Sequence, residues 1–182
     1  MRRLAILLLA LALPCAAAAT DYTVRPKLSR LTFHGIYQGE AFEGHFDQWT
    51  AAISYDPADL EHSKFEVEVT TASAHTGDHD QDSALPGPSF FDVKKFPTAH
   101  FVTTGFRRQG NQVIADGQLT IRDVTRPVSL SVAFVPQGTG ASLAVAGTVR
   151  RLDFDMGTGE YADTSVIGPD VKVTAHLQLT AK

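Results

Sequence analysis

The sequence predicts an all-β fold, built as an antiparallel sandwich or barrel. From Thr20 onward the dominant hydrophobic period is two residues, which is typical of half-buried strands whose side chains alternate between two faces. No part of this region carries a long apolar stripe with the period of a helix. Turn residues interrupt the alternating runs at short intervals, so no helices are available to cover a parallel sheet. The strands are therefore expected to pair with antiparallel neighbours.

The chain begins with a segment that has the three parts of a secretory signal peptide. Arg2 and Arg3 form a basic head, residues 4–13 are apolar, and residues 16–19 are all alanine. The sequence therefore predicts a signal peptide over residues 1–19, cleaved after Ala19, and a single domain over residues 20–182. Since a transmembrane helix needs roughly 20 apolar residues, this run is too short to span a membrane. We expect the mature protein to work outside the cytoplasm.

Cys15 is the only cysteine of the chain. A cysteine just after an apolar run can also be the lipid-modified first residue of a bacterial lipoprotein, which is the alternative to cleavage after Ala19. Cleavage after Ala19 leaves no cysteine, and this excludes disulfides, thiol catalysis and cysteine-based metal sites. It also removes Arg2 and Arg3, so the formal net charge changes from −4 to −6. An acidic chain argues against nucleic acid or an anionic lipid surface as a partner.

Eight alternating runs, followed by a ninth at the C-terminal end, are expected to form the strands. They lie near residues 22–25, 30–38, 43–55, 63–71, 98–107, 111–122, 127–135 and 142–152, with the ninth near 170–181. The alternation is clearest in residues 65–70, 128–134 and 171–179. Residues 109–111 (Gln-Gly-Asn) and 137–140 (Gln-Gly-Thr-Gly) separate β-rich runs and predict hairpin turns.

Helical structure is expected to be short and confined to three places. Asp56 before Pro57 favours one helical turn over residues 56–60. Residues 72–97 and 153–169 lack strand-like alternation, and each segment has room for one or two short helices. No internal repeat, linker or low-complexity segment divides the domain.

Three sequence blocks resemble those of a known family. Residues 89–97 (SFFDVKKFP) precede Ala99-His100-Phe101, residues 117–128 read GQLTIRDVTRPV, and residues 151–157 read RLDFDMG. In this order they resemble the FFD block, the G-x-L-T-i-x-G-v-T-[KR]-P-V block and the R-x-D-F-G segment of YceI-like proteins. The resemblance covers the whole mature chain.

The chain also departs from the family pattern. Gln81 stands where arginine is usual, and Asp123 and Asp155 stand where glycine is usual. Gln81 lies in the loop before the FFD block, so the departures concern loops rather than strands.

The resemblance implies both a fold and a function. YceI-like proteins narrow the expected fold to an antiparallel eight-stranded lipocalin-like β-barrel with one or two short helices. They are usually secreted to the periplasm and enclose a long apolar chain, such as a polyisoprenoid, an isoprenoid quinone or a fatty amide. The resemblance thus implies a periplasmic binding protein, not an enzyme, that carries or sequesters an isoprenoid or fatty chain. It implies no cofactor beyond a bound lipid or quinone.

Other roles stay open at this point. The chain could be an extracytoplasmic enzyme acting on such a lipid, which would need a buried acid–base pair at the barrel mouth. It could instead be the soluble partner of a membrane b-type cytochrome. Transient contact with a membrane and formation of a homodimer are also left open.

A set of apolar side chains is expected to line a ligand cavity. An eight-stranded barrel is just wide enough inside for packed side chains or one small ligand, so core packing is the alternative for each of them. The candidates are Phe33, Phe46, Trp49, Ile53, Phe90, Phe91, Phe101, Leu119, Leu130, Val132, Phe134, Leu143, Val145 and Phe154. The entrance is expected near residues 72–97, where Phe90 and Phe91 either line the opening or plug the barrel end.

No metal site and no catalytic site are predicted. His75 and His79 flank an acidic stretch, but nothing predicts a helix that would bring both to one side, and the stretch lacks the glycine and glutamate of a calcium loop. The chain has no G-x-S-x-G elbow for hydrolysis. The arginines at 107–108 and 150–151 are expected to be solvated or ion-paired at the surface, and Arg151 is expected to form a structural pair with Asp153.

Overall fold

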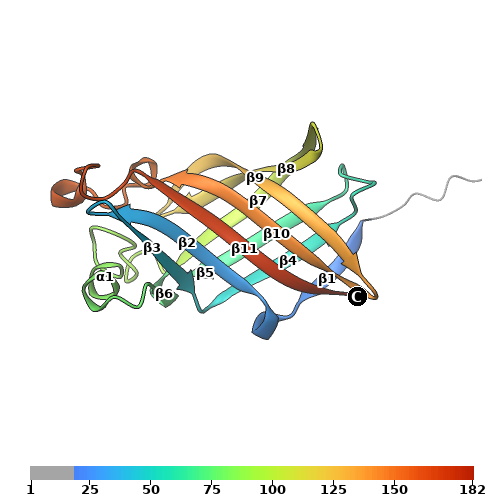
Figure 1. Cartoon of the computed structure of the whole chain (residues 1–182), viewed down its shortest axis with the longest axis horizontal. Coiled ribbons are helices and arrows are strands. Elements are labelled where there is room, and N and C mark those ends of the chain that lie inside the picture. The colour runs from blue at the N-terminus through green and yellow to red at the C-terminus, as the bar shows by residue number, and fades with distance from the viewer. Residues whose placement is uncertain (1–18) are drawn as a thin grey trace, which may run out of the picture.

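Eight lines of antiparallel strand close into a barrel in the computed structural model, which describes residues 19–182 (Figure 1). The strands are β1 (Thr20–Val24), β2 (Arg30–Tyr37), β3 (Glu40–Phe46), β4 (Trp49–Tyr55), β5 (Lys64–Thr70), β6 (Ala74–His75), β7 (Thr98–Gln109), β8 (Gln112–Ile121), β9 (Val124–Gln137), β10 (Gly140–Arg150) and β11 (Asp170–Ala181). Around the barrel the order is β1-β4-β5-β7-β8-β9-β10-β11, and β11 pairs again with β1 to complete the ring. The predicted eight-stranded antiparallel barrel is confirmed.

Three of the eight strand positions around the barrel are each shared by two consecutive strands. β11 pairs with β1 through Val24 and Leu179 and, further along, with β2, so β1 and β2 occupy successive parts of one edge. The 3₁₀-helix η1 (Pro26–Leu28) separates them. β3 and β4 continue each other around residues 47–48, and β6 continues β5.

The break between β3 and β4 corrects the prediction of a single strand over residues 43–55. The backbone N–H of Asp47 donates to the carbonyl of Ser73 at 3.1 Å, and that of Gln48 donates to the Ser73 hydroxyl at 3.0 Å. These bonds hold the chain toward the β5–β6 side of the wall. The partner lies far along the chain, so no local sequence pattern marks the break.

The hairpin turns were predicted from their glycines. β7 turns into β8 at Gly110 and β9 turns into β10 at Gly138, with φ angles of 58° and 57° that glycine adopts freely. β8 and β9 are joined by Arg122 and Asp123, whose φ angles are 52° and 59°. Two consecutive left-handed residues are typical of the hairpin turn that favours glycine, and here both positions carry side chains.

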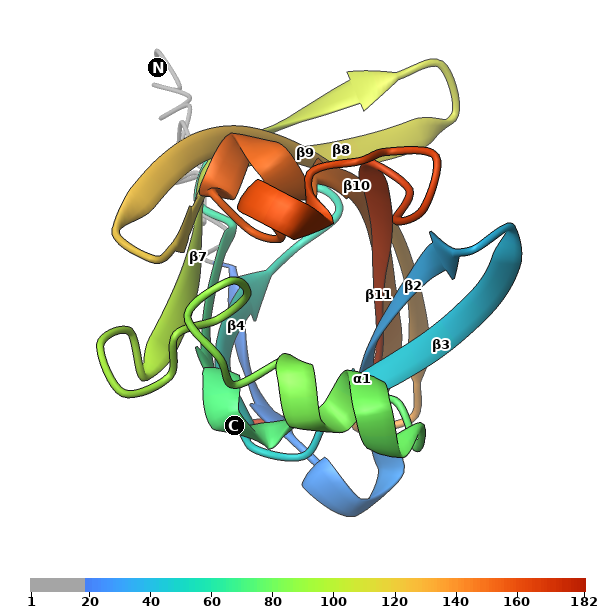
Figure 2. The ribbon, with the colours of Figure 1, turned by 90° about the vertical axis from the view of Figure 1, so that its left-hand side faces the viewer.

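Three of the short helices lie at one end of the barrel. α1 (His79–Ala84) lies on one side of the rim, and η3 (Arg151–Phe154) with η4 (Gly159–Tyr161) lies on the other (Figure 2). The helix η2 (Thr71–Ser73) joins β5 to β6. Both segments in which short helices were predicted contain one. Within the described residues, no helix is long and apolar enough to cross a membrane.

The predicted helical turn at residues 56–60 is wrong. The Asp56 carboxylate accepts a hydrogen bond from the Ala58 N–H at 2.8 Å, and the Asp56 carbonyl accepts one from the Asp59 N–H at 3.0 Å. This arrangement closes a tight turn in which the aspartate side chain bonds to nearby backbone instead of starting a helix.

Aromatic rings fill the end of the barrel opposite the helices. Tyr55 is only 1% exposed, and its ring centroid lies 5.6 Å from that of Phe65, 5.7 Å from Phe106 and 4.9 Å from Phe134. Tyr22 meets Phe134 edge-on at 5.8 Å. Tilted and edge-on pairs of this kind stabilise by about 0.5–1.5 kcal/mol each beyond the area they bury. Side chains therefore close this end of the barrel.

The β8–β9 turn gives a test of backbone strain. Asp123→Gly should raise the free energy of unfolding by about 0.5 kcal/mol, because glycine adopts the left-handed conformation without a steric penalty. Urea unfolding followed through the fluorescence of Trp49, the only tryptophan of the chain, would measure the change. As the converse control, Gly138→Ala should destabilise the protein, since φ at Gly138 is 57°. A loss of stability in the Asp123 variant would contradict the assignment of strain.

Candidate binding cavity

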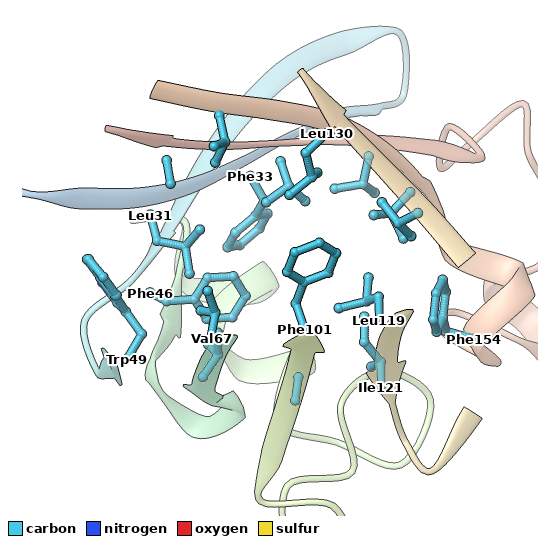
Figure 3. A pocket seen from close by; sticks show the side chains of 18 of the residues that line it. Leu31, Phe33, Phe46, Trp49, Val67, Phe101, Leu119, Ile121, Leu130 and Phe154 are labelled. Carbon is cyan, nitrogen blue, oxygen red and sulfur yellow. The ribbon is translucent and has the colours of Figure 1, made fainter. Parts of the chain in front are cut away.

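An apolar cavity of about 240 Å³ lies inside the barrel, between the aromatic cluster and the loops that carry α1 and η3 (Figure 3). On the same measure a single water molecule needs only about 10–15 Å³, so the cavity has room for a ligand. Most of the side chains predicted from the sequence line it: Phe33, Phe46, Trp49, Ile53, Phe90, Phe91, Phe101, Leu119, Leu130, Leu143, Val145 and Phe154. Their contact with a bound ligand stays a prediction.

Val132 and Phe134 were also predicted to line a cavity, and the structure corrects this. Both belong to the packed core, and Phe134 contacts Tyr22 and Tyr55 in the closed end of the barrel. They lie further along β9 than Leu130, which does line the cavity. Alternation along a strand shows which side chains face inward but not how far each lies along the barrel axis.

The sequence prediction missed lining residues on several strands, and β5 and β11 show this most clearly. Val67 and Val69 of β5 and Val173 and Leu177 of β11 face the cavity. The signal was present, because both strands alternate cleanly, and the inward face could have been extended to each of them. The room inside is provided in part by Ala51, Ala99 and Ala175.

Glycines on neighbouring strands let phenylalanine rings pack close to the barrel wall. A Cβ at Gly117 would lie 2.5 Å from the Phe101 ring and 2.6 Å from the Val102 carbonyl. A Cβ at Gly44 would likewise collide with the ring of Phe33, its cross-strand partner. Each ring occupies the space that a side chain at the glycine would need. The position of both rings in the cavity therefore depends on these two glycines.

Two phenylalanines of the FFD block lie over the mouth. Phe91 is buried and its ring centroid lies 5.9 Å from that of Phe46, while Phe90 packs on Tyr161 at 5.0 Å. Both line the cavity, together with Phe154 from η3. They therefore serve as the inner surface of the mouth and also cover the barrel end.

Arg151 is buried at this mouth, which corrects its prediction as a surface charge. The side chain is 5% exposed and donates to four carbonyls: Ile167 at 2.8 Å, Gly168 at 3.0 Å, Met156 at 3.0 Å and Gly157 at 2.6 Å. Burial lowers the pKa of the guanidinium from its usual value. The predicted pair with Asp153 is absent from the ion pairs of the described residues.

Arg122 also holds loops together at the mouth by donating to backbone carbonyls. Its guanidinium donates to the carbonyl of Phe90 at 2.8 Å and to that of Asp155 at 2.6 Å. It thereby joins the β8–β9 turn to the FFD loop and to the loop after η3. Arg107, in contrast, pairs with Asp116 on the exposed outer surface at 2.7 Å, as expected for a surface arginine.

The loop at α1 is held by hydrogen bonds to its carboxylates. Asp82 accepts hydrogen bonds from the N–H and the hydroxyl of Thr76 at 2.6 and 2.7 Å. Burial alone would raise the pKa of Asp82, but these bonds outweigh burial and hold the pKa below its usual value. His75 lies beside Asp82, whereas His79 lies beside Asp80 and is fully exposed, so the two histidines face different carboxylates.

The chemistry of the cavity is that of apolar contact. Among the described residues that line it, Arg151 is the one with an ionisable side chain, and its hydrogen bonds go to carbonyls of the surrounding loops. The lining therefore presents methyl, methylene and aromatic groups to whatever enters. Such a surface stabilises a ligand mainly by removing apolar area from water.

Comparison with known proteins identifies relatives across nearly the whole chain. Residues 22–179 match the family model of the YceI-like domain. A UPF0312 protein of Vibrio vulnificus is 32% identical over 170 residues, which cover 86% of this chain and 90% of the relative. A UPF0312 protein of Vibrio cholerae is 30% identical over 166 residues, covering 84% and 88%.

Solved structures have the same fold. The crystal structure of Burkholderia cenocepacia BcnA aligns with a TM-score of 0.82 at 27% identity, covering 86% of this chain and 99% of that one. A polyisoprenoid binding domain from Saccharophagus degradans aligns with a TM-score of 0.68 at 14% identity, covering 90% and 99%. At that identity the second likeness concerns the fold alone.

The contact between Gly117 and Phe101 can be tested by adding one methyl group. Gly117→Ala should lower the free energy of unfolding by about 2 kcal/mol, because the new Cβ overlaps a ring and a backbone carbonyl. Gly105→Ala is the matched control, since nothing lies within 4 Å of its Cβ and its φ lies outside the left-handed region. Urea unfolding of both variants gives the comparison. Equal effects at the two glycines would contradict the packing argument.

The buried arginine can be tested against its exposed neighbour. Arg151→Met should destabilise the protein by about 3 kcal/mol, because it leaves buried carbonyls without donors. Arg150→Met, at an exposed position, should change stability by no more than about 0.5 kcal/mol. The urea midpoints of the two variants, each compared with that of the wild type, measure the two losses of stability. Similar losses in both would show that the loop hydrogen bonds contribute little.

Proposed function

The chain belongs to the family of YceI-like domains, and from this membership and its apolar cavity we propose that it binds one isoprenoid-type chain inside the barrel. The class of ligand is a polyprenyl lipid or an isoprenoid quinone, and a fatty chain has the same apolar chemistry. The observation that carries the proposal is the cavity of about 240 Å³, whose lining is apolar apart from Arg151. The polyisoprenoid binding domain of Saccharophagus degradans, which has the same fold, supports this choice of ligand.

The energetics of an apolar chain favour reversible carriage. Removing one methylene from water stabilises by about 0.8 kcal/mol, so a five-carbon isoprene unit contributes roughly 4 kcal/mol before the costs of binding. In the cell the competing environment is a membrane, where the chain is already out of water. Transfer from bilayer to barrel is then close to neutral, and the chain can be both taken up and released.

The proposed place of action is the periplasm. Residues 1–19 have the composition of a signal peptide, and residues 1–18 of this segment lie outside the described residues. An aqueous compartment bounded by membrane is one that an apolar chain cannot cross unaided, so a soluble carrier is useful there. Contact with a membrane or a membrane b-type cytochrome, and a homodimer, stay predictions of the family resemblance.

Binding is favoured over catalysis by the side chains available. A lipid-modifying enzyme would need an acid–base pair beside its substrate, within hydrogen-bonding reach of the proton to be transferred. The one ionisable group among the described lining residues is Arg151, and its donors are engaged by loop carbonyls. The cavity therefore supports a binding protein.

A space-filling variant tests the proposal. Val67→Phe adds a ring inside the cavity, and it should weaken binding of the prenyl alcohol solanesol at least about tenfold by displacing two or more methylenes. Glu66→Phe, the outward-facing neighbour on β5, is the matched control and should bind as the wild type does. Native mass spectrometry gives the stoichiometry, and organic extraction afterwards should return unchanged solanesol. A wild-type protein that binds no prenyl chain, or that converts it to product, would overturn the proposal.

A further inference from the structure

The barrel wall is incomplete between β1–β2 and β3–β4. Pairing of β1 with β4 ends at Tyr22 and Ile53, and pairing of β2 with β3 begins at Leu31 and Phe46. Between these points, within the described residues, no strand pairing joins residues 23–30 to residues 47–52. The wall thus lacks a stretch of the backbone ladder that closes it elsewhere.

The two sides of this gap are held apart by bonds to other strands. On one side, the Arg25 N–H donates to the Gln178 carbonyl at 2.8 Å, and the Ser29 hydroxyl accepts from the Gln178 N–H at 3.0 Å. On the other side, residues 47–48 bond to Ser73 as described above. The segment with η1 is therefore fixed to β11, and the start of β4 is fixed toward β5. Figure 2 shows the blue turn of η1 projecting outward from the wall.

A groove of about 290 Å³ lies on the outside of the gap. Val24 and Pro26 line one side of it, and Thr50 and Ala52 line the other. Thr50 and Ala52 are exposed residues of β4, whose side chains alternate with those that face the cavity. The groove therefore lies directly against the wall strand that also bounds the cavity.

Trp49 and Ala51 border both spaces. Each lines the internal cavity and also the outer groove. Figure 3 places Trp49 at the edge of the cavity, near Phe46 of β3 on its own side of the gap and Leu31 of β2 on the other side. The indole is half-buried and the neighbouring Ala51 is small, so Trp49 is the larger of the two side chains that border both spaces.

We propose that this gap is a lateral port of the cavity, closed by the Trp49 indole, through which the far end of a long apolar chain enters the outer groove. The inference rests on the proposed function and specifies the size of its ligand. Binding pockets for drug-sized ligands have volumes of about 300–1,000 Å³. The internal cavity alone is slightly smaller than this range, and the cavity and groove together lie within it. The port therefore lets the barrel hold a chain longer than its interior.

Plugging the groove from outside tests the port. Thr50→Phe and Ala52→Phe add rings to the groove without entering the cavity, because both side chains point outward. Gln118→Phe, at an exposed position on β8, is the matched control. Each protein would be titrated with farnesol, a short prenyl alcohol, and with solanesol, a long one, in the same detergent micelles. Circular dichroism before each titration confirms the fold.

The port predicts a selective loss. The two plug variants should weaken solanesol binding at least about tenfold, since each methylene removed from contact costs about fourfold in affinity. Farnesol binding should stay within about twofold of wild type, as should both ligands in the control variant. Equal losses for the two alcohols, or no loss for solanesol, would overturn the port while leaving lipid binding intact. Wild-type protein that binds neither alcohol would overturn the proposed function itself.

Trp49 gives a second reading in the unmodified protein, since it is the only tryptophan. Solanesol should increase the quenching of its fluorescence by acrylamide, because the chain displaces the indole toward the outside. Farnesol, which is a much shorter chain, should not increase it. An increase with both alcohols, or with neither, would overturn the role of Trp49 in closing the port.

Discussion

The structure depends on the closure of its sheet, which is completed when β11 at the end of the chain pairs with β1 near its start. A closed antiparallel barrel leaves few backbone donors and acceptors without partners, and eight strands set the width of the bore. At that width the side chains alone decide whether the interior is packed or hollow. Here they do both, at different heights of the same barrel.

The distribution of side chains along the axis gives the barrel two unlike ends. The rings around Tyr55 fill one end, and a cavity follows where smaller residues such as Ala99 and Ala175 meet phenylalanines packed over glycines. The other end is covered by loops, which Arg122 and Arg151 tie together through carbonyls. A buried arginine that bonds only to backbone joins several loop segments, because its planar guanidinium group donates to several carbonyls at once. For the proposed ligand, entry and exit therefore concern the loop end and the wall, not the aromatic end.

The gap beside Trp49 is the exception to closure, and it is stabilised on both sides. Residues 25–29 form hydrogen bonds with β11, and residues 47–48 form them with Ser73. Both sides therefore bond away from the gap rather than to each other. In the proposed port, this break in a wall otherwise closed by hydrogen bonds connects the apolar interior to the outer groove. An apolar cavity and a break in its wall are both suited to a ligand that is a long chain.

Much of the fold and of the cavity could be predicted from the sequence, because two-residue alternation and glycine turns are local signals. They predicted the antiparallel strands, the hairpins at Gly110 and Gly138 and twelve of the residues that line the cavity, and the three blocks indicated the family. Only the tertiary structure decided the depth of Phe134 along the axis, the break at residues 47–48 and the burial of Arg151. The reason is physical: alternation reports the face of a strand but not its height in the barrel. The partners of Arg151 are backbone carbonyls, which every residue carries and no sequence pattern distinguishes.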